Sequence, residues 1–284
     1  MNLDLISPRC RAALIVLVLA GLTACVTPPA LLQDEREIGA PLPLEVSPPT
    51  LTSAPPRPPE APRVIRHGPR NKKWVALTFD ACSTQGHGIF DEKVIRTLIK
   101  LDVPATLFLG GKWMEEHPDE TQELATYKQF ELANHTYRHP HLVRESDARV
   151  RDEIQLTQDM LFTLTGRSAR LFRAPYGEID ARVAGLVGEL GLISVQYDLA
   201  SGDPDPKISS KRLAEYVADR SKNGSIVVLH MNGRGWQTAA ALPRIVQRLR
   251  KDGYKFKTVS QLLAITEKTP VANIPAPVAV PPAP

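Results

Sequence analysis

The chain has 284 residues, of which 43% are hydrophobic and 23% are charged. That composition is sufficient for one large folded domain or two small ones. The formal net charge is only +4, and Lys and Arg are scattered along the chain. Because no basic stripe is interleaved with aromatic residues, nucleic acid is excluded as an expected partner.

The first 24 residues are typical of a signal peptide rather than of a folded element. Their apolar run, 12-AALIVLVLAGL-22, is too short to cross a membrane comfortably. It leads into 22-LTAC-25, which resembles the cleavage signal of bacterial lipoproteins and implies a lipid on the thiol of Cys25. Val26, rather than Asp, then favours the outer membrane, facing the periplasm, within a Gram-negative cell envelope. The alternative is an ordinary signal peptide followed by a chance cysteine.

This interpretation accounts for all three cysteines of the chain. Cys10 leaves with the signal peptide and Cys25 carries the lipid. Cys82 is then the only thiol of the mature chain, which excludes an internal disulfide.

Proline-rich segments flank the region that is expected to fold. Residues 26–69 contain twelve prolines, which favour extended polyproline geometry over a packed core. With the lipidated Cys25, this segment is an expected linker over residues 25–69. Residues 269–284 are similar in composition and form an expected disordered tail. The sequence therefore predicts one folded domain over residues 70–268.

Within that domain, β-rich runs alternate with helical patterns. In chain order, the patterns predict a strand at 74–80, a helix at 91–101, strands at 105–111 and 129–136, a helix at 146–166, a strand at 169–175, a helix at 180–190, a strand at 192–199, a helix at 209–221, a strand at 225–231, a helix at 238–251 and a strand at 255–260. Ser146 and Asp180 are candidate N-caps, and Gly166 and Gly191 are candidate helix stops. The alternation predicts an α/β fold, a distorted and incomplete (β/α) barrel of about seven parallel strands resembling a TIM barrel.

Reactive side chains stand at the ends of five of these predicted strands. They are Asp80, His135, Arg173, Asp198 and His230. In a parallel α/β barrel all C-terminal strand ends open onto one face, and that face holds the active site. We therefore expect these five groups to converge there.

The order of these residues resembles that of the polysaccharide deacetylase family, the NodB-like carbohydrate esterases. The resemblance covers residues 72–262 and rests on 78-TFD-80, 134-NHTYRH-139, 173-RAPYG-177, 197-YDLASGDPDP-206 and 229-LH-230. It implies a hydrolase that removes N-acetyl groups from a glycan polymer containing N-acetylglucosamine, such as peptidoglycan, a chitin-like chain or poly-N-acetylglucosamine.

The resemblance also implies a divalent metal, usually held by one Asp and two His. The two histidines correspond to His135 and His139, and Asp80 is the remaining protein candidate. Pro140 makes a helix through His139 unfavourable, so a loop or a single turn is expected. The alternative is a pair of structural, hydrogen-bonded histidines. Imidazole and oxygen ligands suit Zn²⁺, Co²⁺ or Ni²⁺ about equally, and Zn²⁺ is our first choice.

The resemblance assigns the remaining roles residue by residue. Asp80 corresponds to the general base, and the guanidinium of Arg173 favours its ionised form. His230 corresponds to the general acid. Asp198 is the favoured partner that orients His230, because it ends a predicted strand, and Asp203 is the second choice. Tyr176 corresponds to the residue whose backbone N–H stabilises the oxyanion, or else it is a stacking or turn residue.

The chain departs from the family at position 81. The family motif has two adjacent aspartates, and here the second is Ala81, which has no donor for a metal. Four replacements remain open, in the order Asp80 itself, water molecules alone, the thiolate of Cys82 and the imidazole of His87. The thiolate requires the strand to continue, because only then do positions 80 and 82 share a face.

The leading hypothesis is a metal-dependent N-acetyl hydrolase that acts on a glycan in the cell envelope. One alternative is a non-catalytic glycan-binding protein that lost a metal ligand at Ala81. Another is a hydrolase of O-acetyl esters with the same mechanism. Tyr176, Trp113 and Trp236 are candidates for stacking on sugar rings, or for packing within the fold.

Overall fold

The computed structural model describes residues 64–84, 86 and 88–264. Its sheet contains nine strands: β1 (Val64–Ile65), β2 (Trp74–Ala81), β3 (Ala105–Leu109), β4 (Phe130–Asn134), β5 (Leu171–Phe172), β6 (Ile193–Val195), β7 (Leu199–Ala200), β8 (Ser225–His230) and β9 (Lys255–Phe256). The α-helices are α1 (Glu92–Lys100), α2 (Gly111–Glu116), α3 (Pro118–Thr126), α4 (Asp147–Thr165), α5 (Ala181–Glu189), α6 (Ser210–Arg220), α7 (Thr238–Lys251) and α8 (Val259–Leu263). Single 3₁₀ turns cover Leu142–Arg144 and Pro175–Gly177.

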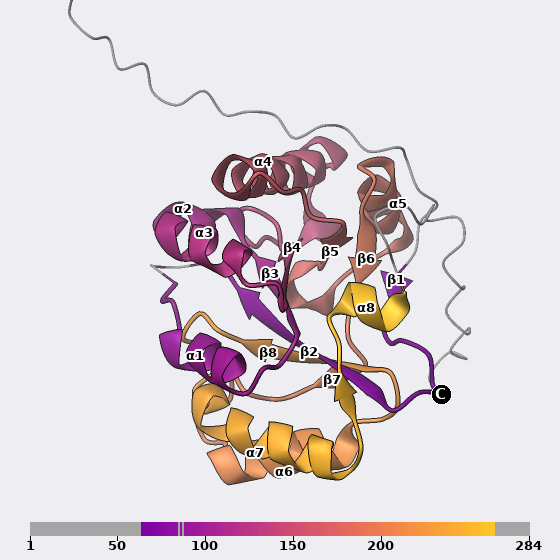
Figure 1. Cartoon of the computed structure of the whole chain (residues 1–284). Coiled ribbons are helices and arrows are strands. Elements are labelled where there is room, and N and C mark those ends of the chain that lie inside the picture. The colour runs from indigo at the N-terminus through magenta and orange to yellow at the C-terminus, as the bar shows by residue number, and fades with distance from the viewer. Residues whose placement is uncertain (1–63, 85, 87, 265–284) are drawn as a thin grey trace, which may run out of the picture. The chain divides into compact units, whose positions relative to one another are not determined.

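The strands form one curled sheet with the order β1-β6-β5-β4-β3-β2-β8-β7, and β9 pairs with β2. Every pairing between these strands is parallel. Figure 1 shows helices α1 to α7 arranged around the outside of this curl. The expected distorted, incomplete α/β barrel is thereby confirmed, with two more strands than the seven predicted.

Local capping explains where several helices begin. The side chain of Ser146 accepts a hydrogen bond from the backbone N–H of Arg149, and that of Asp180 from Val183. Both therefore satisfy N–H groups that have no partner within the helix. At the other end, Gly166 has a φ of 68°, a left-handed conformation that costs glycine little. The predicted caps are confirmed at these positions.

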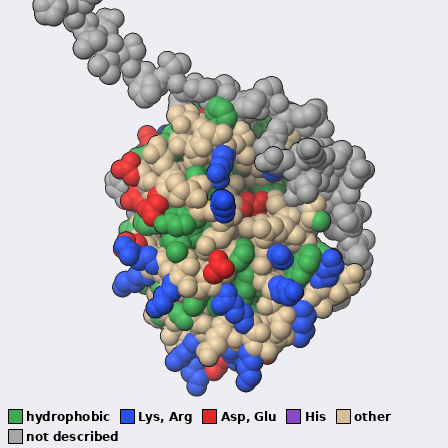
Figure 2. Space-filling model, in the orientation of Figure 1, with side chains coloured by type: hydrophobic (Ala, Val, Ile, Leu, Met, Phe, Trp, Pro, Cys, Tyr) green, Lys and Arg blue, Asp and Glu red, His purple; other side chains and the backbone are tan. Residues whose placement is uncertain are grey.

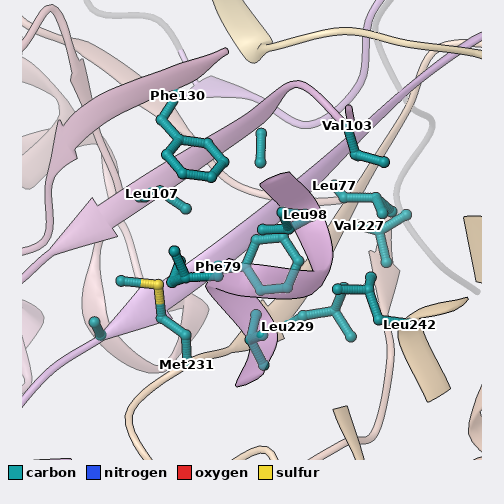
Figure 3. Packing of buried hydrophobic residues seen from close by; sticks show 14 of the residues in the cluster. Leu77, Phe79, Leu98, Val103, Leu107, Phe130, Val227, Leu229, Met231 and Leu242 are labelled. Atoms are coloured by element: carbon teal, nitrogen blue, oxygen red, sulfur yellow. The ribbon is translucent and has the colours of Figure 1, made fainter. Parts of the chain in front are cut away.

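The two faces of β2 pack against different surroundings. Val75, Leu77, Phe79 and Ala81 belong to the main hydrophobic core, which is shared with helices α1 and α7. Figure 3 shows Leu77 and Phe79 among residues of β3, β8 and these helices, including Leu107, Leu229, Leu98 and Leu242. The alternate positions, Ala76, Thr78 and Asp80, face the other way, because side chains along a strand alternate. Thus Asp80 points away from the main core.

The structure differs from the sequence prediction at several places. β1 was not predicted, and the predicted strand 169–175 is reduced to the two residues of β5. The predicted strand 192–199 is two short strands, β6 and β7, separated by residues 196–198. The predicted strand 105–111 ends at Leu109, and helices α2 and α3, which the patterns did not indicate, follow. Pro118 begins α3, where its missing N–H costs nothing. The predicted strand 255–260 shortens to β9, because Thr258 forms a capping box that starts α8.

The predicted signal peptide, the lipidated Cys25, the linker and the tail lie outside the described residues, apart from positions 64–69. Within the described part of the chain, the helices are too short or too polar to cross a membrane. Figure 2 shows Lys and Arg side chains gathered over α6 and α7. The last turn of α7 contains the basic residues Arg248, Arg250 and Lys251.

Candidate active site

One pocket collects most of the predicted site residues at the C-terminal edge of the sheet. Asp80 lies near the end of β2, His135 directly after β4, Arg173 directly after β5 and His230 at the end of β8. The cavity has a volume of about 220 Å³, and its wall includes Asp80, Cys82, His135, His139, Tyr176, Tyr197, Asp203, His230 and Arg234. The predicted convergence of strand ends is therefore observed for Asp80, His135 and His230, with Arg173 directly behind Asp80.

A buried ion pair holds Asp80 in place. Nη1 of Arg173 lies 2.6 Å from Oδ1 of Asp80 and 2.9 Å from Oγ1 of Thr78. The guanidinium also lies over the ring of Phe108, 3.9 Å from its centroid, so its position is fixed by packing as well as by charge. Burial raises the pKa of Asp80, but the charge of Arg173 and the nearby histidines outweigh it, so the pKa lies below its usual value.

The two histidines of the 134-NHTYRH-139 motif face each other across a tight loop. Their ring centroids are 5.0 Å apart. Nδ1 of His135 lies 2.9 Å from the carbonyl oxygen of Arg173, which orients Nε2 of the same ring toward Asp80, with Nε2 and Oδ2 at 3.7 Å. The segment between the histidines is a loop, as Pro140 predicted.

This loop is strained, and buried polar groups hold it. Thr136 and His139 have φ values of 67° and 60°, a left-handed region that costs non-glycine residues free energy. The backbone N–H of His139 donates to Oγ1 of Thr136, and that of Thr136 donates to Oδ1 of Asn134. Such strain persists only where the surrounding structure enforces it, and here it turns both imidazoles toward the pocket.

Both imidazoles are neutral donors. Burial lowers the pKa of His135. Burial, and then the proximity of His135, lowers the pKa of His139 to about 3. Neutral imidazole is the form that binds a metal, through its unprotonated nitrogen.

A third donor atom completes this group. The sulfur of Cys82 and one ring nitrogen each of His135 and His139 all lie within 4.8 Å of one another, and all three residues are buried. Burial, and then the charge of Asp80, raises the pKa of the free thiol to about 12. Asp80 lies beside this group, with Oδ1 already engaged by Arg173. His87, the remaining alternative, lies outside the described residues.

His230 is paired with Asp203, which corrects the predicted partner. Nδ1 of His230 lies 2.9 Å from Oδ1 of Asp203, and the backbone N–H of His230 donates to Oδ2 at 2.8 Å. Thr238 and Ser201 donate their hydroxyls to the same carboxylate. Burial lowers the pKa of His230, but the hydrogen bond and charge of Asp203, with the charge of Asp80, raise it above its usual value.

The prediction that Asp198 orients His230 is wrong. The carboxylate of Asp198 accepts hydrogen bonds from Arg70, from the hydroxyl of Ser225 and from the backbone N–H of Ile226. Those last two residues begin β8, whereas His230 ends it. Five steps of about 3.3 Å along a strand put the two positions roughly 16 Å apart. The error follows from the break between β6 and β7, which places Asp198 at the opposite edge of the sheet.

The three aromatic candidates for sugar stacking differ in their exposure to solvent. Tyr176 has a φ of 59°, is 48% exposed and stacks on His141 with ring centroids 3.9 Å apart. Trp236 is 62% exposed, and its backbone N–H donates to the carbonyl oxygen of Asp203. Trp113 is fully buried and hydrogen-bonded to the carbonyl of Ile89, so the structure excludes it from the sugar-stacking role.

Several residues of the pocket region, among them Asn232 and Arg234, were not identified from the sequence. Asn232 donates its side-chain N–H to the carbonyl oxygen of Cys82 at 2.7 Å and approaches its sulfur at 3.3 Å. Arg234 lines the pocket. Both lie in 230-HMNGRGW-236, directly after a strand that ends on His230, and this position was the available signal.

The arrangement combines a carboxylate, a group of metal-binding donors and a carboxylate-paired imidazole on one face of an incomplete barrel. That combination is one that can serve metal-assisted hydrolysis with general acid–base catalysis. The sequence matches the family model of polysaccharide deacetylase over residues 67–195. A peptidoglycan-N-acetylglucosamine deacetylase of Bacillus cereus is 31% identical over 199 residues, which are 69% of this chain and 90% of that protein.

Two solved structures are similar to this one. A peptidoglycan N-acetylglucosamine deacetylase, crystallised with a hydroxamate-type benzamide, has a TM-score of 0.66 at 28% identity, over 72% of this chain and 95% of that one. A CE4 family pseudoenzyme from Bacillus anthracis has a TM-score of 0.64 at 27% identity, over 71% and 69%. The chain therefore belongs to the polysaccharide deacetylase family, which confirms the family and the enzyme class predicted from the sequence.

Proposed function

We propose that this protein is a metal-dependent deacetylase that removes N-acetyl groups from N-acetylglucosamine residues of peptidoglycan. One observation carries the proposal. Asp80 and the His230–Asp203 pair line the same pocket, and the group formed by Cys82, His135 and His139 lies there too. The similarity to a peptidoglycan-N-acetylglucosamine deacetylase supports this substrate over chitin-like chains or poly-N-acetylglucosamine.

The donor set fits a divalent metal, and Zn²⁺ suits it best. His135 and His139 are neutral, and Nδ1 of His139 is buried without a hydrogen-bond partner among the described residues. A metal bound there would polarise the amide carbonyl of the substrate and fix the attacking water. Imidazole and sulfur donors are typical of zinc sites.

Asp80 acts as the general base. Its lowered pKa keeps it ionised at neutral pH, and Oδ2 is the oxygen that faces His135. It accepts a proton from the water as the water attacks the amide carbon. Arg173, on Oδ1, holds the carboxylate in position for that transfer.

His230 acts as the general acid, and the backbone N–H of Tyr176 stabilises the oxyanion. His230 donates a proton to the nitrogen as the C–N bond breaks, so the amine leaves neutral and acetate is released. Asp203 is a positioning residue, because it touches His230 and not the reacting atoms. Its hydrogen bond keeps the imidazole protonated and correctly oriented.

We also propose that the protein is a lipoprotein of the cell envelope. The motif 22-LTAC-25 supports a lipid on Cys25, with residues 25–69 as a linker, 70–268 as the catalytic domain and 269–284 as a tail. Val26 supports an outer-membrane location facing the periplasm. Replacing Cys25 with Ser should move the protein from the membrane fraction to the soluble fraction, and unchanged membrane retention would contradict the anchor.

The function is tested with the purified full chain, loaded with Zn²⁺ or Co²⁺ and incubated with peptidoglycan fragments and with chitooligosaccharides. We expect the wild-type chain to release acetate and a chelator to abolish this release. Asp80→Asn and His135→Ala should abolish it as well, whereas Asp198→Asn should retain it. Asp198 is a matched control because it is a hydrogen-bonded aspartate of the same sheet at the opposite edge. Absence of acetate from every glycan, with every metal, would overturn the proposal.

The same experiment decides between this function and two alternatives. Ala81 and the similarity to a CE4 family pseudoenzyme favour a non-catalytic glycan-binding protein. That protein would bind the glycan without releasing acetate and would be indifferent to chelator. An O-acetyl esterase would instead release acetate only from O-acetylated glycan, by the same residues.

A further inference from the structure

The group of Cys82, His135 and His139 has the dimensions of a metal site. Ligands at about 2.0–2.3 Å from a tetrahedral zinc ion lie roughly 3.3–3.8 Å from one another. The three donor atoms of this group already lie within 4.8 Å of one another. A movement of the side-chain ends by about 1 Å would therefore bring them onto one ion.

The strand β2 explains how Cys82 reaches this position. Asp80 and Cys82 line the pocket, whereas Ala81 between them belongs to the main hydrophobic core with Phe79. This is the alternation of an extended chain, continued one residue past the end of the strand. The donor that position 81 lacks is thus available from the next residue, on the same face as Asp80.

Neighbouring groups orient these donors as they do around metal ligands. His135 is fixed through the contact of Nδ1 with the carbonyl oxygen of Arg173. Asn232 directs an N–H toward the sulfur of Cys82 at 3.3 Å while it binds the carbonyl oxygen of the same residue. A hydrogen-bond donor of this kind stabilises negative charge on sulfur. His139, by contrast, has a buried Nδ1 with no partner among the described residues, and an unpaired buried nitrogen costs free energy.

We propose that the thiolate of Cys82 is the third protein ligand of the metal, in place of the carboxylate that Ala81 removes. This inference rests on the proposed function only in one respect, which is that the deacetylase reaction would use a metal bound at the same site. As the S–metal bond forms, the S–H bond breaks and its proton passes to solvent, with no change in oxidation state. Asp80 then stays free of the metal as the base. A sulfur ligand makes the site select Zn²⁺, Co²⁺ or Cd²⁺ over Mg²⁺ and Mn²⁺.

The test is the absorption spectrum of the Co²⁺-loaded full chain, since thiolate ligation gives a sulfur-to-cobalt charge-transfer band in the near ultraviolet. In a Cys10→Ser, Cys25→Ser variant, Cys82 is the only thiol. We expect this variant to keep the band and a further Cys82→Ser change to abolish it. Zn²⁺ affinity should then fall by more than the roughly 10- to 100-fold loss that is typical when only a residue behind a metal ligand is changed. His67→Ala, outside the pocket, is the control that leaves the band intact.

The outcomes separate this inference from the proposed function. Co²⁺ bound through histidine, with visible bands lost in His135→Ala but no charge-transfer band, would overturn the role of Cys82, and so would an absence of Co²⁺ binding. Acetate release without the band would leave the deacetylase standing. The band without acetate release would leave the ligand assignment standing and reject the deacetylase. Circular dichroism of each variant shows that a lost band does not reflect unfolding.

Discussion

Each end of β8 is bound by an aspartate from an earlier segment of the chain, Asp198 at one end and Asp203 at the other, and the two aspartates serve different purposes. At the N-terminal end, Asp198 binds the backbone of Ile226, the hydroxyl of Ser225 and the guanidinium of Arg70. At the C-terminal end, Asp203 binds the backbone and ring of His230. The first connects segments of the fold, and the second presents an imidazole to a pocket. The chemistry of an aspartate therefore depends on which edge of a parallel sheet it reaches.

The largest effect is expected at the C-terminal edge, from Asp80→Asn. Loss of the base should lower kcat by about 10²–10⁴-fold. It also leaves the buried Arg173 without its counter-charge, which should lower the free energy of unfolding by about 3 kcal/mol. Initial rates and thermal melts on the metal-loaded protein measure the two effects separately. Full activity in a folded variant would contradict the role of Asp80.

The next largest effect on catalysis is expected from Asp203→Asn. This variant directly tests whether Asp203, unlike Asp198, acts on the imidazole of His230. Because the charge of Asp203 raises the pKa of His230, its removal should lower that pKa. Activity that requires protonated His230 is present below this pKa and is lost as pH rises through it. The basic limb of the kcat/KM profile should therefore move to lower pH, with kcat reduced about 10- to 100-fold. A merely structural role for Asp203 would leave the limb where it is.

A smaller effect is expected from Trp236→Ala, in the loop that follows β8. The residue is 62% exposed, and its backbone N–H donates to the carbonyl oxygen of Asp203. Loss of one stacking contact of about 1 kcal/mol should raise KM for long glycans about 5-fold and leave kcat unchanged. Binding measured with oligosaccharides of increasing length checks this. A fall in kcat with constant KM would show that the indole supports catalysis instead.

The smallest effect on catalysis is expected from Asp198→Asn at the opposite edge. Activity and its pH profile should be unchanged. The free energy of unfolding should fall by about 1 kcal/mol, because asparagine keeps one acceptor oxygen and the pair with Arg70 is partly exposed to solvent. Chemical denaturation beside Asp203→Asn measures the difference. A shifted pH profile in this variant would contradict the assignment of different roles to the aspartates at the two ends of β8.

The position of the candidate site was predicted well from residues that lie at the C-terminal end of a strand. Asp80, His135, Arg173 and His230 each follow an apolar run, and parallel strands bring such ends together whatever the details of their packing. Asp198 met the same criterion, but it was assigned to the wrong end of the sheet. The run 192–199 was predicted as one strand, and it is two strands, β6 and β7. Three residues, 196–198, turn the chain between β6 and β7, and no glycine or proline marks that turn.

The candidate metal ligands show a second limit of prediction from sequence. The motif 134-NHTYRH-139 identified the two histidines, and Ala81 identified the missing carboxylate. The choice among Asp80, water, Cys82 and His87 depended on which side chains face the pocket. That choice required the strand to continue in extended form through position 82, which the residue types at 81 and 82 do not decide.

The sequence by itself determined the α/β class, the alternation of strands and helices, the caps at Ser146 and Asp180, and the identity of the main reactive groups. These features depend on hydrophobic periodicity and on interactions between residues close in the chain. Only the tertiary structure decided that Asp203 pairs with His230, that Cys82 lies beside the two histidines, and that Trp113 is buried while Trp236 is exposed. Each of these is a contact or an exposure set by segments far apart in the sequence, and its energy comes from packing that local preferences do not contain.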